Sequence, residues 1–88
     1  AWFRKAADSG ASPAQYQLGL LYESGEGVEQ SYAQAYFWLA LAARNEPNGP
    51  AREQIAARRD EAATHLKPGV VLATDEQVKE WKAENSGQ

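Results

Sequence analysis

The side chains of this sequence that could do chemistry are few and scattered. His65 is the single histidine, no serine nucleophile motif surrounds it, and the chain has no cysteine. Nucleophilic and acid–base catalysis need a nucleophile or proton donor paired with a base. We therefore interpret His65 as a histidine at a surface or helix end. The sequence predicts no enzyme, and no catalytic residue is assigned.

A second candidate is the acidic turn that holds Glu23, Glu26 and Glu29 around Gly25 and Gly27. Carboxylates can hold a cation, but this turn lacks the aspartate and asparagine spacing of a calcium loop. The Gly-x-Gly pattern does not follow a strand, so a phosphate-binding interpretation fails on its context. The glycines are explained by the turn itself, and we expect no metal and no cofactor.

A third candidate is a group of arginines near the middle of the chain. Arg58 and Arg59, with Arg52 nearby, could bind an acidic partner. The same residues could instead form a solvated helix face that pairs with Asp60 and Glu61, because opposite charges three or four residues apart on a helix attract one another. We favour the solvated face.

Composition limits the chain to one small helical domain. It has 88 residues, is 43% hydrophobic and 24% charged, and has a net charge of −3, which argues against a nucleic-acid partner. No apolar run approaches the roughly 18 residues of a membrane span, so we expect no direct membrane insertion. Without cysteines the compartment stays open between periplasm and cytoplasm. The chain starts without methionine inside an apparent helix, and we interpret it as a fragment.

The stretch from Ser12 to Tyr22 reads as a short helix with a glycine inside it. Ser12 should cap this helix and Gln15 should complete a capping box. Gly19 costs about 1 kcal/mol relative to alanine in a helix. A helix that keeps it should have another backbone passing close by.

The next helix, from Ser31 to about Arg44, is apolar almost all round. Ser31 and Gln34 form a second capping box pattern. Nine apolar residues follow in a row around Trp38, too few for a membrane span. We interpret this segment as a fully packed helix.

A third helix should run from Pro50 to about Thr64 and close the stack. Its outer side is charged, as in the terminal cap of a helical array. We expect residues 70–72 to be extended and Thr74 to cap a short last helix, with Val78 and Trp81 facing inward. The predicted apolar stripe of the third helix consists of Ala51, Ile55, Ala62 and Leu66.

An internal repeat links the beginning of the chain to its middle. Trp2, Ala6 and Ala7 recur as Trp38, Ala42 and Ala43, each with a shift of 36 residues. Helical solenoids have periods in this range. The segment from Ser12 to Asn45, with its Leu-Gly, Gly-x-Gly-Val and Trp-x-x-x-Ala-Ala patterns, resembles the Sel1-like repeat (SLR), a relative of the tetratricopeptide repeat (TPR). The repeat signature consists of Ala14, Leu18, Gly19, Tyr22, Gly25, Gly27, Val28, Ala35, Trp38, Ala42 and Ala43.

The resemblance implies an all-α fold, an α/α superhelix (a TPR-like solenoid) of antiparallel helix pairs. We expect residues 1–10 to end a preceding repeat and residues 11–47 to form a complete one. Residues 48–83 should be degenerate capping helices at the C-terminal end of the array, followed by a frayed tail at 84–88. The third helix lacks the Leu-Gly and Gly-x-Gly-Val signatures, as the final element of such arrays often does.

The resemblance also implies a non-enzymatic scaffold or adaptor that binds a protein or peptide in the groove of the superhelix. Such proteins often serve bacterial envelope, signalling or virulence-related complexes. The first helix of the pair should line the concave side, and Gln15, Tyr16, Gln17 and Glu23 are the candidate partner-binding residues. The aromatic residues could equally be core. The alternative function is a structural spacer or self-association module beside another domain.

Overall fold

The structure is built only from helices in the part of the chain that it describes. The computed structural model describes residues 2–82, and the side chains of residues 4–82. No strand occurs in this range, which confirms the all-α fold. The helices are α1 (Trp2–Asp8), α2 (Ser12–Ser24), α3 (Tyr32–Asn45), α4 (Pro50–Ala63) and α5 (Pro68–Glu80).

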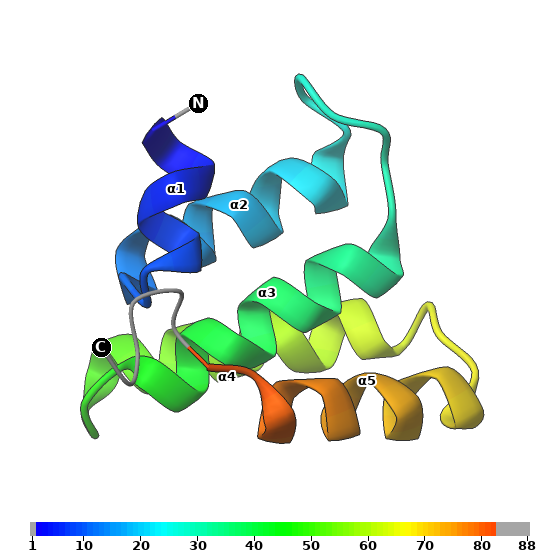
Figure 1. Ribbon diagram of the computed structural model, residues 1–88. Helices are drawn as coiled ribbons and strands as arrows, with labels where there is room; N and C mark the ends of the chain where they lie inside the picture. The colour runs from blue at the N-terminus through cyan, green and yellow to red at the C-terminus, as the bar shows by residue number, and fades with distance from the viewer. Residues whose placement is uncertain (1, 83–88) are drawn as a thin grey trace.

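Helix α3 lies at the centre of the molecule. It packs against α2 on one side and against α4 and α5 on the other, while α1 packs against α2 (Figure 1). Leu39 and Leu41 of α3 are completely buried, and Trp38 is 3% exposed. A helix with apolar residues on all its faces is stable in water only when neighbours cover it on several sides. The prediction of a fully packed helix is therefore confirmed.

Gly19 lies where α2 and α3 approach most closely. A Cβ atom built on Gly19 would lie 2.7 Å from Cγ of Leu39 and 3.3 Å from the carbonyl oxygen of Ala35. Any side chain at this position would push the two helices apart, because packed interiors have no spare volume. This contact confirms that a second helix passes close to the glycine.

The turn between α2 and α3 uses the glycines and the cap that the sequence indicates. Gly25 and Gly27 have φ values of 80° and 76°, a left-handed conformation that glycine adopts without steric cost. The Oγ of Ser31 accepts a hydrogen bond of 3.2 Å from the backbone N–H of Gln34. Ser31 is thus the N-cap of α3, as predicted.

The start of α2 differs from the prediction, because Ser12 is not its cap. The helix begins at Ser12, and the preceding Ala11 occupies the N-cap position without a side-chain hydrogen bond. The hydroxyl of Ser12 instead donates to the carboxylate of Glu46, just after α3. Because Ala11 takes the N-cap position, Ser12 lies inside the first turn, and its hydroxyl joins the start of α2 to the segment after α3 through a charge-assisted hydrogen bond.

The end of the chain also differs from the prediction. Residues 70–72 are helical, because α5 begins at Pro68 and continues to Glu80. Proline fits the first turn of a helix, where its missing N–H is not needed. Thr74 lies inside this helix and is buried, as is Val78, and Trp81 is half-buried just beyond its end. The expected inward positions of Val78 and Trp81 are confirmed, whereas the cap at Thr74 is wrong.

Helix α4 buries a narrower stripe than predicted. Ile55 and Ala62 are buried, but Ala51 is exposed, and Leu66 is half-buried beyond the last residue of the helix. The two buried residues are the ones that face α3. The short stripe follows from the position of α4, which packs on one neighbour and leaves its other faces open.

Candidate functional site

The outer face of α2 carries most of the predicted partner-binding residues. Gln17 is exposed, and Tyr16, Leu20 and Glu23 are half-buried. Spacings of three and four residues place Tyr16, Leu20 and Glu23 along one side of the helix. Gln17 lies beside this row, farther out in solvent. Three of the four candidate residues therefore share one accessible surface.

Helix α4 completes this surface with a cation. The ring of Tyr16 packs against Ile55 of α4 and against α3. The nearby hydroxyl of Tyr16 and, to a smaller extent, the negative charge of Glu23 raise the pKa of the Arg58 guanidinium above its usual value. Arg58 also lies 3.6 Å from the carboxylate of Glu61, and its side chain is 45% exposed. We call Tyr16, Gln17, Leu20, Glu23 and Arg58 the α2–α4 surface.

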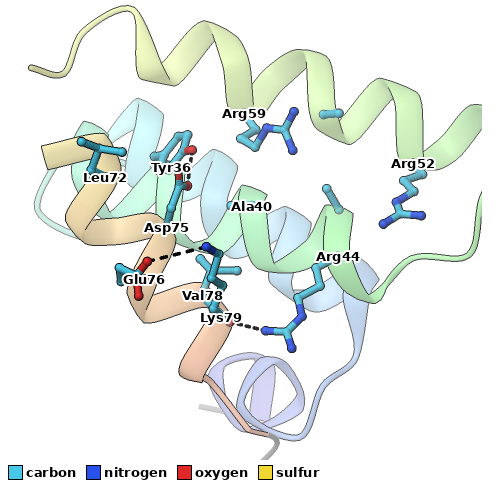
Figure 2. Close-up of a pocket in the computed structure, with 12 residues that line it drawn as sticks. Tyr36, Ala40, Arg44, Arg52, Arg59, Leu72, Asp75, Glu76, Val78 and Lys79 are labelled. Carbon is cyan, nitrogen blue, oxygen red and sulfur yellow. Dashed lines mark hydrogen bonds and ion pairs between the residues drawn. The ribbon is translucent and has the colours of Figure 1, made fainter. Parts of the chain in front are cut away.

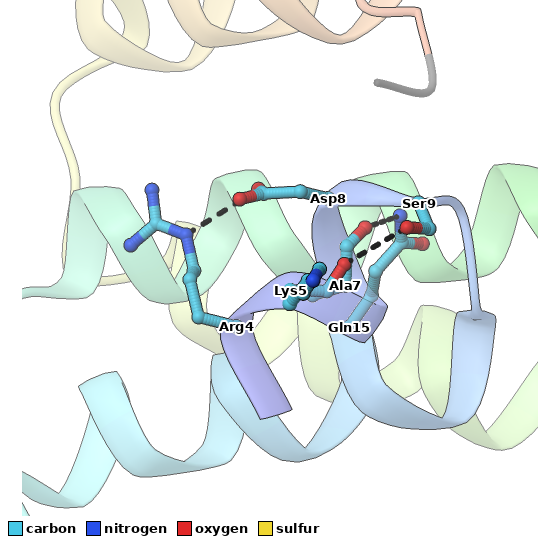
Figure 3. A network of polar contacts seen from close by, with 6 residues as sticks. All are labelled: Arg4, Lys5, Ala7, Asp8, Ser9 and Gln15. Atoms are coloured by element: carbon cyan, nitrogen blue, oxygen red, sulfur yellow. Dashed lines mark hydrogen bonds and ion pairs between the residues drawn. The ribbon is translucent and has the colours of Figure 1, made fainter. Parts of the chain in front are cut away.

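Gln15 has a different place from the other candidates. It is completely buried, and its Nε2 donates a 2.9 Å hydrogen bond to the carbonyl oxygen of Ala7 in α1 (Figure 3). Its Oε1 accepts a 3.0 Å hydrogen bond from Nδ2 of Asn45 in α3. Gln15 thus connects three helices and is inaccessible to a partner, which corrects its assignment to the binding surface. Because buried polar groups need hydrogen-bond partners, the position requires an amide.

The repeat-signature residues lie mostly in the interior, where they position the surface. Trp38 is buried, and the guanidinium carbon of Arg4 lies 5.1 Å from its ring centroid. Gly27 is exposed at the turn, and Tyr22, Gly25 and Val28 are half-buried. The fully buried members of the signature are Ala14, Leu18, Gly19, Ala35, Trp38, Ala42 and Ala43.

The remaining chemical candidates lie apart from this surface. His65 is exposed and stacks on Tyr32, with ring centroids 3.9 Å apart and an interplanar angle of 7°. Arg59 pairs with Asp60 at 3.0 Å, so part of the arginine group does pair with its acidic neighbours. Within residues 2–82 no three metal-binding side chains come together. Over the same range, every helix is too short or too polar to cross a membrane.

The role of Arg58 beside α2 was not predicted from the sequence. The charge pattern of α4 identified it only as part of a solvated face. Its position next to Tyr16 depends on α2 and α4 both packing on α3. In the sequence, Tyr16 and Glu23 already place a hydroxyl and a negative charge on one face of a helix, which favours a nearby cation. The cation, Arg58, belongs to a segment far away in the sequence.

Neighbouring helices that pack on one another, with Gly19 at the contact between α2 and α3, are typical of a helical-repeat protein. Residues 1–10 and 12–46 match the Sel1 repeat family, and the chain belongs to that family. Sel1 repeats are generally protein-interaction modules and typically are not catalytic.

One curated relative is the chitin synthase regulator SKT5 of Saccharomyces cerevisiae (strain ATCC 204508 / S288c). The two sequences are 40% identical over 45 residues. That alignment covers 51% of this chain and 6% of the yeast protein. No solved structure matches the chain significantly.

Proposed function

We propose that this chain is a non-enzymatic scaffold or adaptor module that binds a protein or peptide through the α2–α4 surface. The observation that carries the proposal is the packing of Tyr16 of α2 against the cluster that contains Ile55 of α4, at an accessible junction of the two helices that Arg58 borders. Tyrosine and arginine are among the residues that most often dominate the binding energy of protein interfaces.

The physical character of this surface supports a protein partner. Leu20 and the Tyr16 ring offer apolar area, while Gln17, Glu23 and Arg58 surround them with polar groups. An apolar centre with a polar rim is the usual anatomy of a protein interface. The packed α3 beneath holds both helices in place, so little conformational entropy is lost when a partner binds.

The comparisons support the same role at a coarser level. Sel1 repeats generally bind proteins, and the yeast relative is named as a regulator of chitin synthase. A scaffold that contacts other proteins fits such a role. A place in a bacterial signalling complex stays a prediction.

The test is affinity capture of partners from the source lysate with the chain and two variants. Tyr16→Ala should remove one protein that the unchanged chain enriches, because the aromatic anchor is lost. Gln54→Ala, an exposed change on the outer side of α4, should retain it. Thermal unfolding of both variants shows whether the fold is intact. Equal capture by Tyr16→Ala would contradict the proposal, and enrichment of the chain alone would favour the self-association alternative.

A further inference from the structure

A second accessible feature is a groove between α4 and α5. Both helices pack on α3, and the space between them has a volume of about 370 Å³ (Figure 2). Ala40 and Ala43 of α3 and Ala56 of α4 contribute small side chains to its lining. Such short side chains leave room where larger ones would fill the space between the helices.

The groove carries an excess of positive charge in an acidic chain. Its cations are Arg44, Arg52, Arg59 and Lys79, and its only carboxylates are Asp75 and Glu76. Each carboxylate already has a partner in the groove. Asp75 accepts a hydrogen bond from the hydroxyl of Tyr36, and Glu76 lies 3.6 Å from Nζ of Lys79.

Two of these arginines contact only neutral acceptors. Arg44 donates to the backbone carbonyl of Val78, and Arg52 donates a 3.1 Å hydrogen bond to the side-chain oxygen of Asn48. Neither forms an ion pair with any carboxylate in the part of the chain whose side chains are described. Guanidinium groups form their strongest hydrogen bonds with carboxylates, often two at once. One end of the groove therefore presents two cations suited to an incoming carboxylate.

The other end of the groove offers apolar surface. Leu72 of α5 is 68% exposed, and in Figure 2 it lies beside Tyr36, at the far end from Arg44 and Arg52. Leu72 therefore adds exposed apolar area at this end of the groove. The groove thus combines an apolar end, a floor of alanines and a cationic end.

We propose that this groove binds a short acidic peptide segment of a partner protein. A carboxylate of the segment pairs with Arg44 and Arg52, and an apolar side chain of the segment covers Leu72. Charge complementarity selects this occupant, because Lys79 and Arg59 are paired with Glu76 and Asp60, whereas Arg44 and Arg52 have no carboxylate partner among the described side chains. The site goes beyond the proposed function, since Arg52 lies on the α5 side of α4 and Arg58 on the α2 side.

The test is a selection from a display library of short random peptides on the immobilised chain, followed by titration of the selected peptides. We expect enrichment of peptides with aspartate or glutamate near an apolar residue. Arg52→Gln should weaken their binding about tenfold or more, the loss expected for one charge-assisted hydrogen bond. Lys5→Gln removes the same charge from an exposed position on α1, outside both the groove and the α2–α4 surface, and should change the affinity less than about twofold.

Several outcomes would overturn the proposal. Failure of the library to yield acidic peptides would exclude this ligand class. Equal loss of binding in Arg52→Gln and Lys5→Gln would indicate a general attraction by charge and no defined site. A dimer in sedimentation velocity that Arg52→Gln dissociates would assign the groove to a second copy of the chain. Thermal unfolding of each variant shows whether loss of the fold is the cause. Capture of a partner through Tyr16 is a separate experiment, so the two proposals can fail independently.

Discussion

Gly19 and Gly69 are both helical glycines, and alanine should affect them in opposite directions. At Gly69 nothing lies within 4 Å of an added Cβ, so Gly69→Ala should stabilise the fold by up to about 1 kcal/mol through helix propensity. At Gly19 the added atom would lie 2.7 Å from Leu39, and Gly19→Ala should cost about 1–3 kcal/mol by overpacking. Denaturant unfolding measures the change in the free energy of unfolding for both variants. Changes of the same sign would contradict the close contact between Gly19 and Leu39.

Gln15 and Gln17 provide a matched pair on α2. Gln15→Ala removes two hydrogen bonds and leaves the carbonyl of Ala7 and the amide of Asn45 without their partner. We expect a loss of about 2 kcal/mol in the free energy of unfolding. Gln17→Ala changes an exposed residue and should stay within about 0.5 kcal/mol. Urea unfolding of the two variants measures these losses. If Gln15→Ala leaves the free energy of unfolding unchanged, the hydrogen bonds of Gln15 do not stabilise the fold.

Tyr36 should make stability fall at high pH. Burial and, second, the hydrogen bond to Asp75 raise the pKa of Tyr36 from 10.0 to about 12. The folded state thus holds the phenol proton more tightly than the unfolded state. Its contribution to stability is complete below pH 10 and is lost as pH rises through 12. Unfolding titrations should show a smaller loss in this window for Tyr36→Phe; an identical loss in both proteins would contradict the raised pKa.

At the scale of helices, two polar contacts join the C-terminal half of α5 to α3. Asp75 accepts a hydrogen bond from Tyr36, and the carbonyl of Val78 accepts one from Arg44. The final carbonyls of a helix have no partner within the helix. The carbonyl of Val78 accepts from the backbone N–H of Trp81 at 3.3 Å and also from Arg44, so this second contact from a neighbouring helix should hold the last turn of α5.

Arg44→Gln should therefore loosen the end of α5 without disturbing α2. We expect amide hydrogen exchange to accelerate in residues 78–80, because local opening becomes easier when the cap is lost. Exchange around Leu18 and Gly19 should be unchanged, since these residues pack on the opposite side of α3. Acceleration throughout the chain would show instead that Arg44 supports the whole fold.

The helices differ in how well the sequence predicted them. The close approach at Gly19 was predicted because a glycine inside a helix is costly. The cap at Ser31 was predicted because a capping box is a local sequence pattern. Ser12 and Thr74 show the same Ser/Thr-x-x-Gln pattern as Ser31, yet neither caps a helix. Ala11 takes the N-cap position of α2 just before Ser12, and Pro68 starts α5 six residues before Thr74. A capping pattern therefore predicts a helix start only where the helix does not begin earlier.

At the scale of the whole molecule, α3 positions both surfaces. It carries α2 on one side and α4 and α5 on the other, and these neighbours form the α2–α4 surface and the groove between α4 and α5. The family could be predicted from the Leu-Gly, Gly-x-Gly-Val and Trp-x-x-x-Ala-Ala motifs, and the all-α fold follows from that resemblance. The neighbours of Arg58 and Arg52 could not, because both arginines lie on a charged helix whose orientation depends on contacts with α3.

Site-directed photo-crosslinking tests the central claim, protein binding through the α2–α4 surface, most directly. A photoreactive side chain replaces Gln17 in one variant and Ala57, on the outer side of α4, in a control; both residues are exposed. After irradiation in the source lysate, we predict that the variant at position 17 forms one covalent adduct with another protein and that the control does not. Identical adducts from both positions, or none from position 17, would contradict the claim.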